Sequence, residues 1–152
     1  MNPSELRLGN WVTIKNEANW TTLENKPMIV VGLHYAGEGA IKLFPKSSHS
    51  ISVFNHATKR EYSQFNEFIQ PIILTEEWLY KFGFEENGVD KKENEKYRKY
   101  WSEGKFDVYK IISFYLDNNK SHEPDIKYVH QLQNLYFALT GEELTLKTTT
   151  NE

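Results

Sequence analysis

The chain has 152 residues, no cysteine, and a formal net charge of −3 from 18 basic and 21 acidic side chains. This length suits one domain, and the missing thiols exclude disulfides, thiolate metal sites and cysteine nucleophiles. The mild negative charge provides no general field for holding DNA or an anionic membrane. The longest apolar run, 28–33, is too short to span a bilayer, and the start of the sequence lacks a signal-peptide pattern. We therefore expect a cytoplasmic protein without membrane contact.

The first half of the chain predicts β-structure. Runs of β-branched and aromatic residues indicate strands from Trp11, at 28–35, at 40–44, at 48–54 and within 64–72. The turn Gly37-Glu38-Gly39 is expected to join the second and third of these as a hairpin, and Pro71 is expected at a sheet edge. The spacing predicts a curled antiparallel sheet of four or five strands, similar to an SH3-like barrel.

A short helix is predicted after this sheet. In "ILTEEWLYKFGF", Thr75 suits an N-cap, two glutamates follow at the positive end of the helix dipole, and Gly83 suits the C-terminal stop. The next segment, 85–96, is charged and lacks an apolar period, which predicts a solvated loop.

The last third predicts a hairpin and a second helix. "KYRKYWSEGKFDVYKIISFYL" is expected to turn at 102–104, a helix is expected from Val129 to the stop at Gly141, and 142–147 is expected to form a last strand. The predicted fold is α+β: a curled antiparallel sheet, two helices and a C-terminal hairpin. We expect a single domain over 1–147, divisible into a β-rich part, 1–72, and an α+β part, 73–147, before a disordered tail, 148–152.

The second helix carries an unusual face. A core stripe and an opposite face are predicted from 100° steps, and Gln133 borders the opposite face. The stripe is Val129, Leu132, Leu135, Tyr136 and Leu139, and the opposite face is His130, Asn134 and Phe137. One interpretation is structural: the helix is covered on both sides, Phe137 packs under a loop or the second hairpin, and the amides satisfy nearby backbone groups. The other is a recognition face, in which Phe137 stacks on a flat ligand and the amides and His130 contact its polar edge.

The stretch "KYRKYW" mixes cations with rings, a composition that suits phosphates and stacked bases. On a strand, Lys96, Arg98 and Tyr100 share one face, while Tyr97, Lys99 and Trp101 share the other. The alternative is an ordinary amphipathic strand with lysines that extend to water.

Catalytic and metal-binding patterns are absent from the sequence. The five histidines lack metal-ligand spacing, and no P-loop, dinucleotide-binding glycine pattern or nucleophile elbow occurs. We therefore predict a non-enzyme without metal or cofactor.

The segments "ELRLGNWV" (5–12), "PIILTEEWLYKFGFE" (71–85), "YWSEGKFDVY" (100–109) and "IKYVHQLQNLYFALTGEELTL" (126–146) carry a resemblance to a family. In these segments, the sequence resembles a widespread family of small uncharacterised proteins from Bacteroidota and their phages and mobile elements. The resemblance implies a phage or mobile-element origin, and it assigns no activity and no functional residues.

These observations lead to three functional hypotheses. The first is a sponge of phage anti-defence type, which sequesters a small nucleotide-type signal of host immunity. The second is a protein-binding inhibitor or assembly module that uses exposed aromatic residues on a host protein. The third, nucleic-acid binding, is disfavoured by the charge, and a homo-oligomer remains open. The candidate ligand-binding residues are Trp20, Arg98, Lys99, Tyr100, Trp101, His130, Gln133, Asn134 and Phe137.

Overall fold

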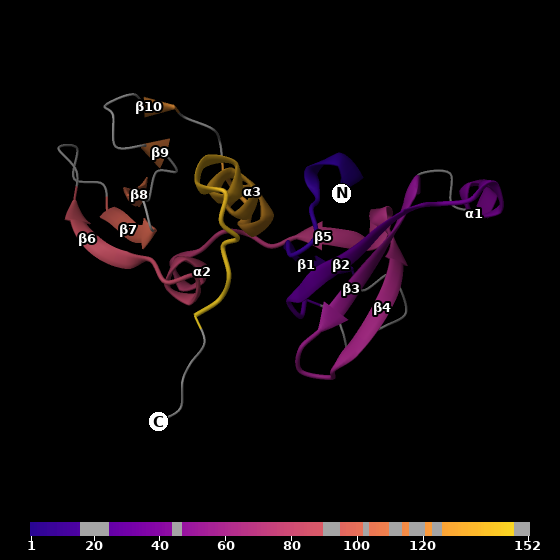
Figure 1. The fold of residues 1–152 in the computed structure, drawn as a ribbon. Helices are drawn as coiled ribbons and strands as arrows, with labels where there is room; N and C mark the ends of the chain where they lie inside the picture. The colour runs from indigo at the N-terminus through magenta and orange to yellow at the C-terminus, as the bar shows by residue number, and fades with distance from the viewer. Residues whose placement is uncertain are drawn as a thin grey trace. The chain divides into compact units, whose positions relative to one another are not determined.

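The computed structural model describes residues 1–15, 25–43, 47–89, 95–101, 104–109, 114–115, 121–122 and 126–147. The chain is α+β and divides into two compact units, each drawn with its own sheet in Figure 1. The first unit comprises Met1–Ile73 and Tyr128–Leu135, and the second comprises Leu74–Lys127 and Tyr136–Glu152. The expected single domain over 1–147 stays a prediction. Within the described residues, no helix is both long and apolar enough to cross a membrane.

The first unit is built on a five-stranded antiparallel sheet. Its strands are β1 (Trp11–Ile14), β2 (Met28–Tyr35), β3 (His49–Asn55), β4 (Arg60–Phe65) and β5 (Ile69–Pro71), in the order β4-β3-β2-β1-β5. The predicted edge position of Pro71 is confirmed, because β5 pairs with β1 alone among the described strands.

The strands of this sheet form a meander with one returning strand, and the expected SH3-like barrel stays a prediction. Strands β1 to β4 follow one another as a meander, and the 3-10 turn η3 (Asn66–Phe68) then brings β5 back to pair with β1. No pairing joins β4 to β5 within the described part of the chain, so the sheet is curled but open. The predicted curled antiparallel sheet is therefore confirmed.

The core of the first unit lies against one face of this sheet. The buried side chains are aliphatic: Leu6, Val12, Ile14, Met28, Val30, Ile51, Val53 and Ile69. Those on β2 and β3 come from alternate positions, as a half-buried strand requires. All four residues of β1 are buried, which explains why its sequence shows no clear alternation. The short 3-10 turn η1 (Pro3–Glu5) precedes Leu6.

The predicted strand at 40–44 is wrong. The segment after β2 forms the helix α1 (Glu38–Leu43), and β2 pairs instead with β3, where Tyr35 lies opposite His49. Neither Gly37 nor Gly39 has the positive φ that a tight hairpin would require. Glu38 in the first turn and Lys42 in the last turn both suit the helix dipole.

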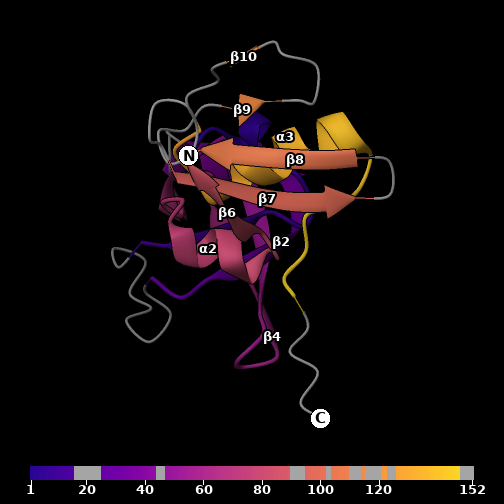
Figure 2. The same ribbon diagram turned by 90° about the vertical axis from the view of Figure 1, so that its left-hand side faces the viewer.

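The second unit contains the other antiparallel sheet, in which β6, β7 and β8 lie side by side (Figure 2). Its strands are β6 (Glu85–Val89), β7 (Glu95–Trp101), β8 (Gly104–Tyr109), β9 (Phe114–Tyr115) and β10 (Ser121–His122), in the order β10-β9-β8-β7-β6. The predicted C-terminal hairpin is confirmed as β7 and β8. The predicted loop at 85–96 is wrong at both ends, because β6 pairs with β7 through backbone groups and places Glu85 opposite Arg98. Such pairing needs no apolar period.

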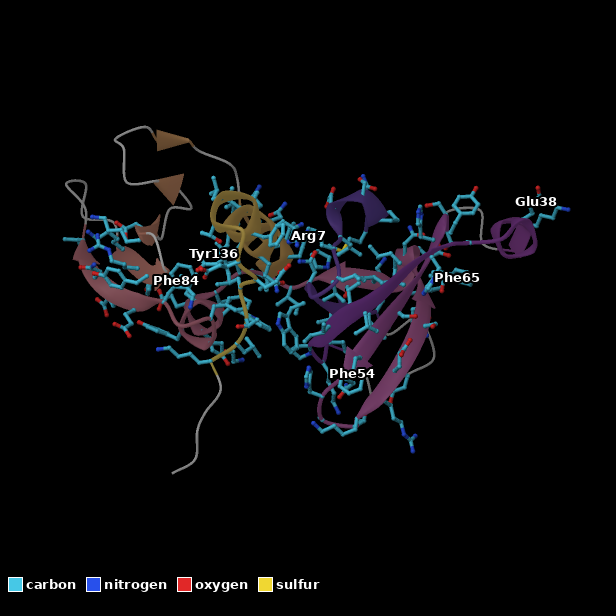
Figure 3. All side chains as sticks on the ribbon, in the orientation of Figure 1. Arg7, Glu38, Phe54, Phe65, Phe84 and Tyr136 are labelled. Atoms are coloured by element: carbon cyan, nitrogen blue, oxygen red, sulfur yellow. The ribbon has the colours of Figure 1, made fainter. Side chains whose placement is uncertain are left out.

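The predicted first helix is present as α2 (Glu76–Lys81), with Trp78 and Leu79 buried. Gly83 follows with φ of 84°, as the predicted stop requires. Thr75 occupies the N-cap, but its side chain makes no capping hydrogen bond. Figure 3 labels two buried rings of the same unit, Phe84 and Tyr136.

The predicted second helix is confirmed as α3 (Val129–Thr140), and Gly141 follows with φ of 72°. The division between the units falls inside this helix, after Leu135. The predicted last strand at 142–147 is wrong: this segment has no strand pairing, although Leu144 is buried. The alternating apolar residues Leu144 and Leu146 therefore resemble a strand pattern in the sequence, although the segment joins no sheet. The predicted disordered tail, 148–152, lies outside the described residues.

Candidate functional site

The amide face of α3 binds the chain's own N-terminal segment. Gln133 is buried, its Oε1 accepts a hydrogen bond from the Trp11 backbone N–H at 2.8 Å, and its Nε2 donates to the Gly9 carbonyl at 2.9 Å. A glutamine that spans a donor and an acceptor two residues apart binds extended backbone as a neighbouring strand would. Gln133 is thus part of the fold of the first unit.

Asn134 makes a second pair of contacts with the same segment. Its Nδ2 donates to the Glu5 carbonyl at 2.7 Å, and its Oδ1 accepts from Asn10 Nδ2 at 3.0 Å. The side chain of Asn10 also accepts from the Arg7 backbone N–H at 2.8 Å and is buried. The structural interpretation of the two amides is confirmed, and both are engaged within the protein itself. We define the contacting residues, 5–11, as the N-terminal segment.

His130 lies beside these amides and is only 1% exposed. Neither ring nitrogen has a hydrogen-bond partner among the described residues, and Nε2 is 3.8 Å from Oε2 of Glu5, beyond hydrogen-bond distance. The Tyr128 ring stacks on the imidazole with centroids 5.8 Å apart and planes 14° from parallel. Burial lowers the pKa of His130, and the Glu5 carboxylate partly offsets this shift.

Phe137 and Trp20 are two further predicted ligand-binding residues. Phe137 is 36% exposed and belongs to the second unit, whereas His130, Gln133 and Asn134 belong to the first. Trp20 lies outside the described residues.

The predicted hairpin places its residues on two faces, as the alternation indicated. On one face, Tyr97 is 2% exposed and contacts the Tyr80 ring of α2, with centroids 5.8 Å apart. On the other face, Tyr100 is 67% exposed. This second face carries Lys96, Arg98 and Tyr100 from β7 and, opposite them, Lys105 and Asp107 from β8; we call these five residues the Tyr100 face.

Arg98 is held firmly in the Tyr100 face. Its Nε donates to Asp107 Oδ1 at 2.6 Å and its Nη2 donates to Oδ2 at 2.8 Å, a bidentate ion pair between directly opposed residues. With its amide oxygen facing Arg98, Asn87 accepts from Nη1 at 2.7 Å. The hydrogen bonds with Asp107 raise the pKa of Arg98. The guanidinium carbon lies 5.9 Å from the centre of the Tyr100 ring, within cation–π range.

Lys99 points away from this face and has a structural role. Its Nζ donates to the Phe82 carbonyl at 2.8 Å, at the C-terminal end of α2, where a cation is favourable. Burial and the neighbouring Lys147 lower the pKa of Lys99. Trp101 lies in β7 opposite Gly104, and its side chain is outside the described set.

Sequence reasoning missed Asp107 and Lys105. The signal was present: a hairpin that pairs Trp101 with Gly104 sets Arg98 opposite Asp107 and Tyr100 opposite Lys105. Counting outward from the turn would have found both. Within the described ranges, no group of three or more His, Asp or Glu side chains could hold a metal ion.

No family model, curated protein or solved structure matches the chain. Function is therefore inferred from the residues and their contacts alone.

Proposed function

We propose that the protein is a non-catalytic binding module that contacts a protein partner through the Tyr100 face. The observation that carries the proposal is the pairing of an exposed ring, Tyr100, with a guanidinium fixed by Asp107. Tyrosine and arginine are enriched among the residues that dominate protein–protein binding energy. As part of the same proposal, the protein acts in the cytoplasm of a bacterial host and comes from a phage or mobile element.

Rigidity of this face favours a protein partner. Immobilising a flexible side chain opposes binding by about 0.5–1.5 kcal/mol. Arg98 is already immobilised by its two hydrogen bonds to Asp107, so most of the entropic cost of fixing this side chain is absent on binding. The ion pair also leaves Arg98 poorly suited to hold a phosphate, because Asp107 neutralises its charge at close range.

The two lysines of the Tyr100 face indicate what the partner's surface contains. Lys105 lies directly opposite Tyr100 on β8, and Lys96 lies on the same side of β7. A pocket for one aromatic ring, with carboxylates at its rim, complements this arrangement, because rim charges increase association rates. We therefore propose an acidic host protein as the partner.

A site-specific photo-crosslinker tests this proposal. A photoreactive phenylalanine at position 100 is expected to crosslink one host protein in lysate, and excess unlabelled wild-type protein is expected to suppress the product. The matched control carries the same residue at position 35, where Tyr35 is 74% exposed in the first unit. The Arg98→Ala protein should compete poorly. Identical products from positions 100 and 35, or equal competition by Arg98→Ala, would contradict the assignment.

A second candidate function is sequestration of a small nucleotide-type ligand. It is supported by the placement of Lys96, Tyr100 and Lys105 on one face, where a base could stack and phosphates could meet ammonium groups. A thermal-shift screen against mono-, di- and cyclic nucleotides and ADP-ribose derivatives distinguishes the two candidates. A shift of several degrees that Tyr100→Ala abolishes would favour the ligand, and the absence of any shift would favour the protein partner.

A further inference from the structure

The contacts of α3 with the N-terminal segment contain a group whose charge can change. Gln133 and Asn134 make four hydrogen bonds with this segment, and all of these groups are permanently neutral. His130 packs beside them on the same helix and buries two ring nitrogens without hydrogen bonds among the described residues. A buried polar group of this kind is stable when neutral and strongly disfavoured when charged.

We propose that His130 is a proton-sensitive latch: the neutral imidazole lets α3 hold the N-terminal segment, and protonation of the ring releases that segment. The geometry supplies the reason. An imidazolium needs acceptors for two N–H donors, and the nearest carboxylate oxygen, Glu5 Oε2, is 3.8 Å from Nε2.

The charged and titratable groups around the ring do not supply the hydrogen-bond acceptors that the imidazolium lacks. Glu5 is the acidic group facing His130, and its side chain is 52% exposed, so water screens its attraction. Tyr128 stacks on the ring face and offers no acceptor there. The Met1 ammonium also attracts the Glu5 carboxylate.

The direction of the pH effect follows from linkage. The pKa of His130 in the latched state is lowered by burial below its ordinary value near 6.5. The released state, in which the ring meets water, binds the proton more readily. Release is therefore promoted as the pH falls below about 6.5, and the effect saturates once the pH is below the lowered pKa.

Release would expose groups that are now covered. Leu6 is 5% exposed in the latched state, and both amides of the α3 face are bonded to backbone. Opening of the latch exposes the apolar side chain of Leu6, the carboxamides of Gln133 and Asn134 and the His130 imidazolium. The protein would thus present a second, acid-dependent binding surface, separate from the Tyr100 face.

Hydrogen exchange of the Trp11 amide tests the latch in the full chain, because this N–H bonds Gln133 Oε1. Linkage of one proton predicts that its protection factor falls about tenfold for each pH unit below about 6.5. The Phe82 amide, bonded to the Trp78 carbonyl in the second unit, is the internal reference and should keep its protection. A Trp11 protection factor that stays constant between about pH 7 and 5 would overturn the latch.

Two variants and one titration separate the latch from general acid effects. In His130→Leu, which cannot titrate, the Trp11 protection factor should become independent of pH; in the control His34→Gln, at an exposed position, the slope should persist. By NMR, the His130 ring should titrate below the ordinary histidine value of about 6.5, and Glu5→Gln should lower its midpoint further. If His130→Leu does not fold, the wild-type titration still decides: a His130 midpoint at or above about 6.5 would overturn the proposal.

Discussion

Replacing Gln133 by methionine provides the sharpest test of the α3 face. The change keeps length and flexibility but removes both hydrogen bonds to the N-terminal segment, those with the Trp11 N–H and the Gly9 carbonyl. A buried backbone group left without a partner destabilises by about 1–3 kcal/mol, so two such groups predict a loss of about 2–6 kcal/mol. That loss is large beside the free energy of unfolding of a whole domain, which is on the order of 10 kcal/mol.

The assay is urea unfolding followed by circular dichroism, together with hydrogen exchange at Trp11. Gln131→Met is the matched control, because Gln131 lies on the same helix and its Oε1 accepts a hydrogen bond from the Tyr128 N–H at 3.1 Å. The control should lose about 1 kcal/mol or less. If Gln133→Met loses no more stability than its control and the Trp11 amide keeps its protection, the assignment of Gln133 as a partner that stabilises the N-terminal segment is refuted.

Other substitutions test separate parts of the structure. Thr75→Ala should change the free energy of unfolding by less than about 0.5 kcal/mol, since the side chain makes no capping bond, and urea unfolding would show this. Gly83→Ala should lower the melting temperature, because φ is 84° and the new Cβ would lie 2.9 Å from Lys147 Cε. Ile51→Ala should cost about 2–5 kcal/mol in the same urea assay, since Ile51 is fully buried. Lys147→Gln should raise the pKa of Lys99, measured by NMR of its Cε. Because the Lys99 pKa is lowered on folding, its contribution to stability grows as pH rises toward 10.5, and Lys147→Gln should weaken that growth.

Local sequence signals predicted much of the fold. The hairpin of β7 and β8, the helix α3 with its glycine stop, and the edge position of Pro71 all follow from residues close together in the chain. The failures at 40–44 and 142–147 have a common cause. An apolar residue at every second position suits a strand with one buried face, but a strand also needs a pairing partner, and the whole sheet determines which segments pair.

The candidate site could be predicted only in part, for a similar reason. Alternation placed Tyr100 and Arg98 on one face correctly, because that rule is local. The partners of Gln133 and Asn134 are more than 120 residues away along the chain, and no pattern around α3 indicates them. Phe137 favoured the hypothesis of a recognition face, whereas Gln133 and Asn134 on the same helix form hydrogen bonds with the N-terminal segment.

The separation of 124 residues between Gln133 and Gly9 has a consequence for biosynthesis. The first unit needs residues from both ends of the chain, with most of the second unit encoded between them. At typical translation speeds the ribosome takes about 6–25 s to add the 124 residues from Gly9 to Gln133. During that interval the nascent β1 has no α3 to cover it, and its backbone groups at Gly9 and Trp11 stay open to chaperones and to other nascent chains. Synthesis of the first unit therefore begins before that of the second unit, and it is completed only after most of the second unit has been made.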